Sequence, residues 1–204
     1  HSPDPESSEI SDSPVSTKQT LPSFALSFSR EDSLHPYKAS SRSNLDIAPL
    51  LYEGLTAVNA DYTVQLDLAA SIDETDPLHP VAVIRSDARF SDGSPVTAED
   101  VAVSFAAAKE TETYAPLLTN IASATAHGTD RVAFTLSSPD PQWRACLSFP
   151  VVKPGEEEPP LGSGAYIYNA GDETLTLKDG RSGSIGTIHL RDFPDTDAML
   201  HGLE

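Results

Sequence analysis

The stretch that most strongly limits the fold runs from residue 89 to residue 109 and reads RFSDGSPVTAEDVAVSFAAAK. Its Asp-Gly-Ser-Pro sequence is typical of a turn. Thr97 follows at a position suited to cap a helix, and Asp100 completes a variant of the capping box. Later apolar residues recur at helical spacing and predict a buried stripe, formed by Val101, Phe105 and Ala108. The stretch therefore predicts a turn followed by a helix that packs on a core.

Short strands and further helices are predicted on both sides of this helix. Phe24, Leu26 and Phe28 alternate with polar or small residues and predict a strand. Further strands are predicted at residues 62–66, 81–84, 131–136, 166–169, 174–177 and 187–191. Helices are predicted at residues 44–55, with Asp46 as N-cap and Pro49 in the first turn, and at residues 142–149 and 195–203. This irregular alternation favours a mixed α/β domain over a bundle or a barrel.

The charge balance limits the partners of the protein. The formal net charge is −18, from 31 acidic and 13 basic residues, which disfavours nucleic acid and anionic membrane surfaces as partners. Two interpretations of the acidity stay open: a solubilising surface, or carboxylates that receive a cationic solute. Residues 1–21 are rich in Ser, Pro, Asp and Glu and predict a flexible polar tether.

No catalytic constellation emerges from the sequence. Apart from His1, the histidines are dispersed and show no metal-binding spacing: His35, His79, His127, His189 and His201. Gly162-Ser163-Gly164 lacks the G-x-S-x-G frame of a nucleophile loop, and a turn explains both glycines. Cys146, the single cysteine, lies in an apolar stretch and is interpreted as a small buried hydrophobe. We therefore expect no catalytic residues, no metal and no cofactor.

Four segments, taken in order, carry a resemblance to a known family. Residues 33–36 (SLHP) are similar to its "SLDP" segment, and residues 50–55 (LLYEGL) to its "YEGL" segment. Residues 90–101 (FSDGSPVTAEDV) are close to its "F-DG-P-TAEDV" signature, and residues 161–166 (LGSGAY) to its "GTGPY" segment. The chain thus resembles the amino-terminal part of the family 5 solute-binding proteins, which serve dipeptide, oligopeptide and nickel importers.

This resemblance implies a fold, partners and a location. It implies the mixed-sheet, amino-terminal lobe of a type II periplasmic-binding-protein-like fold over residues 22–204, with an inserted subdomain at about residues 37–150. Family members are roughly twice as long, so the second lobe would be missing. The implied partners are a peptide or other small solute and an ABC permease complex, and the implied state is a monomer that is extracellular, membrane-tethered or periplasmic. His35 in place of the usual Asp, and Ala165 in place of Pro, depart from the family pattern.

The resemblance also implies a binding site. In the family, an extended peptide lies between two lobes and pairs with the main chain just before the "SLDP" segment. In this sequence that position corresponds to Ser29, Arg30, Glu31 and Asp32. Glu31 or Asp32 would receive the ammonium group of a peptide, whereas the alternative is a polar loop after a strand. An alternative function is a sensing or protein-interaction module built on the same lobe.

Overall fold

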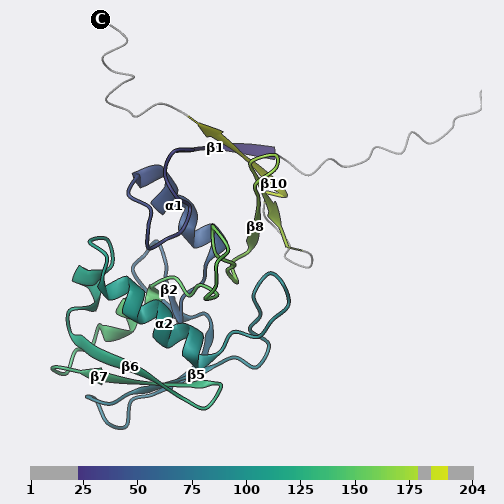
Figure 1. The fold of residues 1–204 in the computed structure, drawn as a ribbon. Coiled ribbons are helices and arrows are strands. Elements are labelled where there is room, and N and C mark those ends of the chain that lie inside the picture. Colours follow the sequence, from purple (N-terminus) through teal and green to yellow (C-terminus); the bar gives the residue numbers. More distant parts are fainter. Residues whose placement is uncertain (1–22, 179–184, 193–204) are drawn as a thin grey trace, which may run out of the picture.

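Two hydrophobic cores, each with its own β-sheet, organise the protein (Figure 1). The computed structural model describes residues 23–178 and 185–192. The predicted tether at residues 1–21 and the predicted helix at residues 195–203 lie outside these residues. Within them, helices and strands mix as the sequence predicts for an α/β domain.

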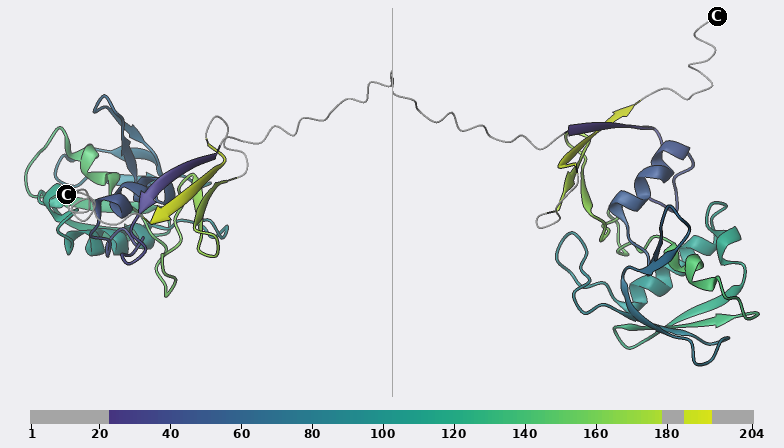
Figure 2. Two further views of the ribbon diagram at one scale, coloured as in Figure 1. Left: turned by 90° about the horizontal axis from the view of Figure 1, so that it is seen from above. Right: turned by 180° about the vertical axis from the view of Figure 1, so that it is seen from behind.

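The first sheet brings together strands from opposite ends of the chain. Its order is β1 (Ser23–Phe28), β10 (Thr187–Asp192), β9 (Thr174–Leu177) and β8 (Tyr166–Asn169). β1 runs parallel to β10, and the other pairs are antiparallel. The sheet is therefore mixed, as predicted, and Figure 2 shows β1 and β10 side by side at one end of the molecule.

Helix α1 (Arg42–Leu51) packs against this sheet but has different bounds from the predicted helix at residues 44–55. Its N-cap is Ser41, whose hydroxyl accepts a hydrogen bond from the Asn44 N–H, so the prediction of Asp46 as N-cap was wrong. Pro49 lies in the last turn and not in the first. The helix ends early because Tyr52 is extended, and Leu55 is buried in the other core.

The second sheet lies beneath helix α2 (Ala98–Lys109) (Figure 1). It is antiparallel, in the order β4 (Ala69–Asp73), β5 (Val81–Ile84), β7 (Arg131–Leu136) and β6 (Ile121–His127). The predicted capping box is present: Thr97 Oγ1 accepts from the Asp100 N–H at 3.3 Å, and Asp100 Oδ2 accepts from the Thr97 N–H at 2.9 Å. The predicted stripe is buried.

Shorter elements complete this part of the molecule. A hairpin joins β2 (Thr56–Val58) to β3 (Val64–Leu66), and 3-10 helices span Ala115–Leu118 and Trp143–Ser148. The strand predicted at residues 62–66 begins only at Val64, because Tyr62 adopts a left-handed turn conformation with φ 67°. β2, β4 and β6 were not predicted.

The chain passes from one core to the other at two positions. The core beneath α2 is built from residues between Leu55 and Val151, whereas the core of the first sheet takes its residues from Phe28–Tyr52 and from Val152–Leu190. The chain thus leaves the first core after Tyr52 and returns to it at Val152. The inserted subdomain at about residues 37–150 stays a prediction.

Candidate functional site

A groove of about 360 Å³ lies where β1 ends. Residues 30–34 form one side of this groove, and Glu158, Tyr168 and Glu173 contribute to the other. Three of the four residues predicted to contact a ligand therefore line one groove: Arg30, Glu31 and Asp32. Ser29, the fourth, immediately precedes them.

Asn44 fixes the loop that carries these residues. Its side chain is 1% exposed. Asn44 Oδ1 accepts from the Ser29 N–H at 2.7 Å, and Asn44 Nδ2 donates to the carbonyls of Ser29 and Ser33, each at 3.0 Å. Both ends of the loop are thus tied to the first turn of α1. Sequence reasoning missed Asn44, although an amide among the apolar positions of a helix is the signal that could have indicated it.

The side chains of Asp32 and Arg30 are committed to contacts within the protein. Asp32 Oδ2 accepts from the N–H groups of Ser40 at 3.0 Å and Ser41 at 2.8 Å. Partial burial opposes ionisation, yet these hydrogen bonds lower the pKa of the Asp32 carboxyl below its ordinary value. The Arg30 guanidinium donates to both carboxylate oxygens of Glu173, at 2.9 and 2.8 Å.

Glu31 is the carboxylate that the groove leaves available. Its side chain is exposed, and within residues 23–178 and 185–192 it makes no hydrogen bond or ion pair. Across the groove, Glu158 accepts from the Ser33 hydroxyl and pairs with Lys38 at 3.0 Å. Of the two acids that the sequence offered as ammonium acceptors, only Glu31 has its carboxylate free for that role.

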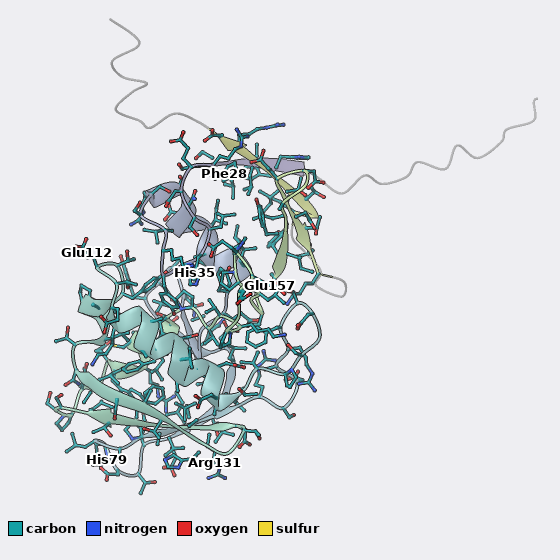
Figure 3. The ribbon with its side chains drawn as sticks, viewed as in Figure 1. Phe28, His35, His79, Glu112, Arg131 and Glu157 are labelled. Atoms are coloured by element: carbon teal, nitrogen blue, oxygen red, sulfur yellow. The ribbon has the colours of Figure 1, made fainter. Side chains whose placement is uncertain are left out.

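His35 follows Leu34, which lines the groove, and lies between the two parts of the molecule (Figure 3). Its Nδ1 accepts a hydrogen bond from the Tyr37 N–H at 3.1 Å. Burial lowers the pKa of the imidazole, while nearby Glu158 opposes this effect. Hence the neutral ring is favoured at this position.

The glycines of the Gly162-Ser163-Gly164 segment bring the acidic loop, residues 155–160 (GEEEPP), close to α1. The Gly164 N–H donates to the Leu51 carbonyl at 2.9 Å. A Cβ at Gly162 would lie 2.1 Å from the Leu51 oxygen, and one at Gly164 would lie 2.5 Å from the Leu50 oxygen. Only glycine permits this approach, so the segment serves the packing of the loop.

Two further findings concern the part of the chain that the structure describes. There, no group of three or more His, Cys, Asp or Glu side chains is placed to hold a metal ion. No helix in the same residues has the length and apolar character needed to cross a bilayer.

The family follows from a match of residues 63–179 to the model for bacterial extracellular solute-binding proteins, family 5 Middle. This match covers more than half of the chain. The chain belongs to family 5 of these proteins. The predicted family is thereby confirmed, and family 5 is a family of extracellular binding proteins. No curated protein sequence matches the chain.

Solved structures of similar proteins confirm the fold class. Pheromone receptor PrgZ is 16% identical with a TM-score of 0.72, over 89% of this chain and 45% of that one. AppA of Bacillus subtilis, an oligopeptide-binding protein in complex with a nonapeptide, is 21% identical with a TM-score of 0.68, over 89% and 42%. NikA of Brucella suis, in complex with Fe(III)-EDTA, is 21% identical with a TM-score of 0.65, over 88% and 41%. The chain therefore spans less than half the length of these structures.

Proposed function

We propose that this chain is the amino-terminal lobe of a solute receptor, which captures peptides or related small solutes in a cleft against a second lobe. The observation that carries the proposal is the fixed loop at the end of β1, in which the Glu31 carboxylate has no partner among the described residues. The protein would deliver its solute to an ABC permease, would act as a monomer without catalysis, and would be periplasmic or tethered outside the membrane.

The loop suits the capture of a peptide amino terminus. Asn44 and Asp32 hold it in place through hydrogen bonds to the main chain, so little ordering is required when a ligand arrives. An extended peptide would pair with the main chain of residues 29–32, which gives affinity that tolerates different sequences. Glu31 would pair with the terminal ammonium, as a charge-assisted hydrogen bond.

The test is calorimetry on the full-length protein with a library of tripeptides, offered with free and with acetylated amino termini. We expect Glu31→Gln to weaken binding of the free peptides about tenfold, the usual scale for a hydrogen bond to a charged group. Binding of the acetylated library should change little.

The matched control is Glu112→Gln, which removes the same charge from an exposed position away from the groove (Figure 3). Equal losses in the two variants would overturn the role of Glu31. Failure of the full-length protein to bind any member of either library would overturn peptide capture and favour the sensing or protein-interaction module.

A further inference from the structure

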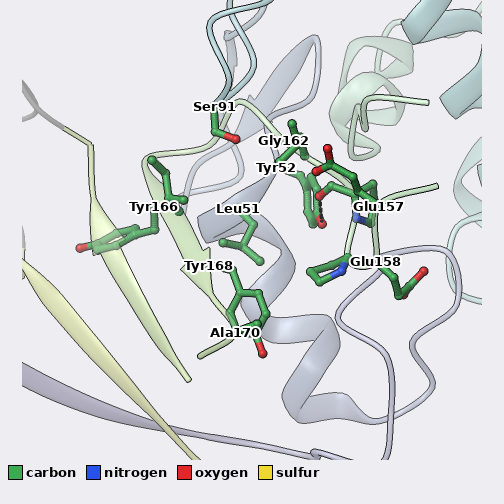
Figure 4. Close-up of a pocket in the computed structure, with 13 residues that line it drawn as sticks. Leu51, Tyr52, Ser91, Glu157, Glu158, Gly162, Tyr166, Tyr168 and Ala170 are labelled. Carbon is green, nitrogen blue, oxygen red and sulfur yellow. Dashed lines mark hydrogen bonds between the residues drawn. The ribbon is translucent and has the colours of Figure 1, made fainter. Parts of the chain in front are cut away.

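A second pocket adjoins the groove and is separate from the loop of residues 29–32. It has a volume of about 310 Å³ and lies between the acidic loop and β8 (Figure 4). The pocket and the groove share Glu158, Pro159, Tyr168 and Ala170 as lining residues. Its volume is at the lower end of the range for small-molecule sites, ~300–1,000 Å³. A ligand in the groove could therefore place one side chain in this pocket.

Three tyrosines are among the residues that line the pocket: Tyr52, Tyr166 and Tyr168. The Tyr166 ring points away from the pocket toward the other strands of the first sheet (Figure 4), so the rings of Tyr52 and Tyr168 supply the aromatic surface. The Tyr52 hydroxyl donates to the Pro160 carbonyl at 2.7 Å, and the Tyr166 hydroxyl donates to the Ile185 carbonyl at 2.7 Å. These bonds fix two of the rings. Tyr168 lies on the side of the pocket that faces the groove, because it lines both spaces.

The charge of the pocket is negative. Glu157 and Glu158 line it, and no Lys or Arg is among its lining residues. Lys38 pairs with Glu158 at 3.0 Å. Glu157 is exposed and makes no hydrogen bond or ion pair in the residues that the structure describes. The pocket thus combines tyrosine rings with the Glu157 carboxylate, which acts electrostatically on the Lys153 ammonium but forms no ion pair with it, because Lys153 pairs with Asp92.

We propose that this pocket binds the alkylammonium side chain of a lysine in the captured peptide. The aromatic faces attract a cation through their quadrupoles, and Glu157 supplies the ion pair. The methylene stem of lysine would pack along the rings while its charged end reaches the carboxylate. This inference rests on the proposed function, because the peptide main chain must lie in the adjoining groove.

The experiment compares lysine with norleucine, which has a similar apolar stem and no charge. Calorimetry on the full-length protein would use trialanine peptides that carry one or the other residue at each of the three positions. At one position, lysine should bind about tenfold more tightly than norleucine, the scale of a hydrogen bond to a charged group.

Three variants test whether the lysine preference arises in this pocket. Glu157→Gln should reduce the lysine preference several-fold and leave norleucine binding unchanged. Glu156→Gln removes the same charge from the same loop but from a residue that lines neither space, and it should leave the preference intact. Tyr168→Leu should reduce the preference as well, because the cation–π contribution is lost.

The outcomes separate this inference from the function on which it rests. If norleucine peptides bind tightly and lysine peptides bind no more tightly, the lysine pocket is overturned and peptide capture is retained. The same conclusion follows if Glu157→Gln and Glu156→Gln show equal lysine preferences. Absence of binding by every peptide overturns the proposed function and the pocket together.

Discussion

At the scale of single residues, Asn44 fixes the main chain of the loop that lines the groove. Asn44→Ala would leave the Ser29 N–H and two carbonyls without their partner. Since each unsatisfied buried group costs about 1–3 kcal/mol, we expect the free energy of unfolding to fall by at least ~2 kcal/mol. Urea denaturation measures this effect. Ser43→Ala is the control, because the Ser43 hydroxyl has only 3.5 Å contacts; equal losses would contradict the role of Asn44.

Two glycines allow a matched test of how closely the main chain of the loop packs against that of α1. In Gly164→Ala, the new Cβ would lie 2.5 Å from the Leu50 oxygen, whereas a Cβ at Gly171 meets nothing within 4 Å. Overpacking of this kind costs about 1–3 kcal/mol, so Gly164→Ala should lower the thermal midpoint clearly and Gly171→Ala should not. Similar midpoints would show that the loop can move away from α1 at little cost.

His35 should make stability depend on pH. Burial lowers the pKa of its imidazole below 6.5, with Glu158 opposing. A base whose pKa is depressed on folding contributes its full stability above the unfolded pKa and loses it as pH falls. Between about pH 7 and about pH 5, the urea midpoint of the wild type should therefore fall more than that of His35→Gln. Parallel curves would contradict this. His127→Gln, at an exposed position of β6, is the control.

At the scale of elements, α2 tests how far local signals stabilise the fold. The Thr97 hydroxyl accepts from the Asp100 N–H, and loss of an N-cap costs about 1 kcal/mol. Thr97→Ala should lower the urea midpoint accordingly without changing the slope, and Thr97→Ser should recover most of the loss because it keeps the hydroxyl. An unchanged urea midpoint in Thr97→Ala would contradict the assignment of Thr97 as the N-cap of α2.

At the scale of the whole molecule, we expect this chain alone to bind solute weakly or not at all. The groove opens on one face, and small-molecule sites usually enclose most of the ligand surface. Water also competes for hydrogen bonds on an open face, so each bond contributes little net free energy. Calorimetry with a mixed peptide library should show micromolar binding by the full-length protein only. Equal affinity of the isolated chain would overturn the two-lobe cleft.

Local sequence signals predicted the elements that local interactions stabilise. The turn and capping box before α2 fall within a few residues, and the 3.6-residue period of its apolar side chains matches its buried face. The start of α1 was placed too late although its cap is local, because Asp46 and Ser41 are both suitable N-cap residues and the sequence pattern does not choose between them. β6 was missed because its sequence IASATAH has few large apolar residues to reveal the alternation.

The sequence by itself determined the family, through four segments in a fixed order, and the position of the loop at Ser29–Asp32. Tertiary structure alone decided which side chains of that loop are free, because their partners come from distant positions: Glu173 holds Arg30, whereas Glu31 has no described partner. It also decided that β1 lies beside β10 and that an acidic loop faces Tyr168 across a pocket. Such contacts depend on chain closure over long distances, and short-range periodicity carries no information about them.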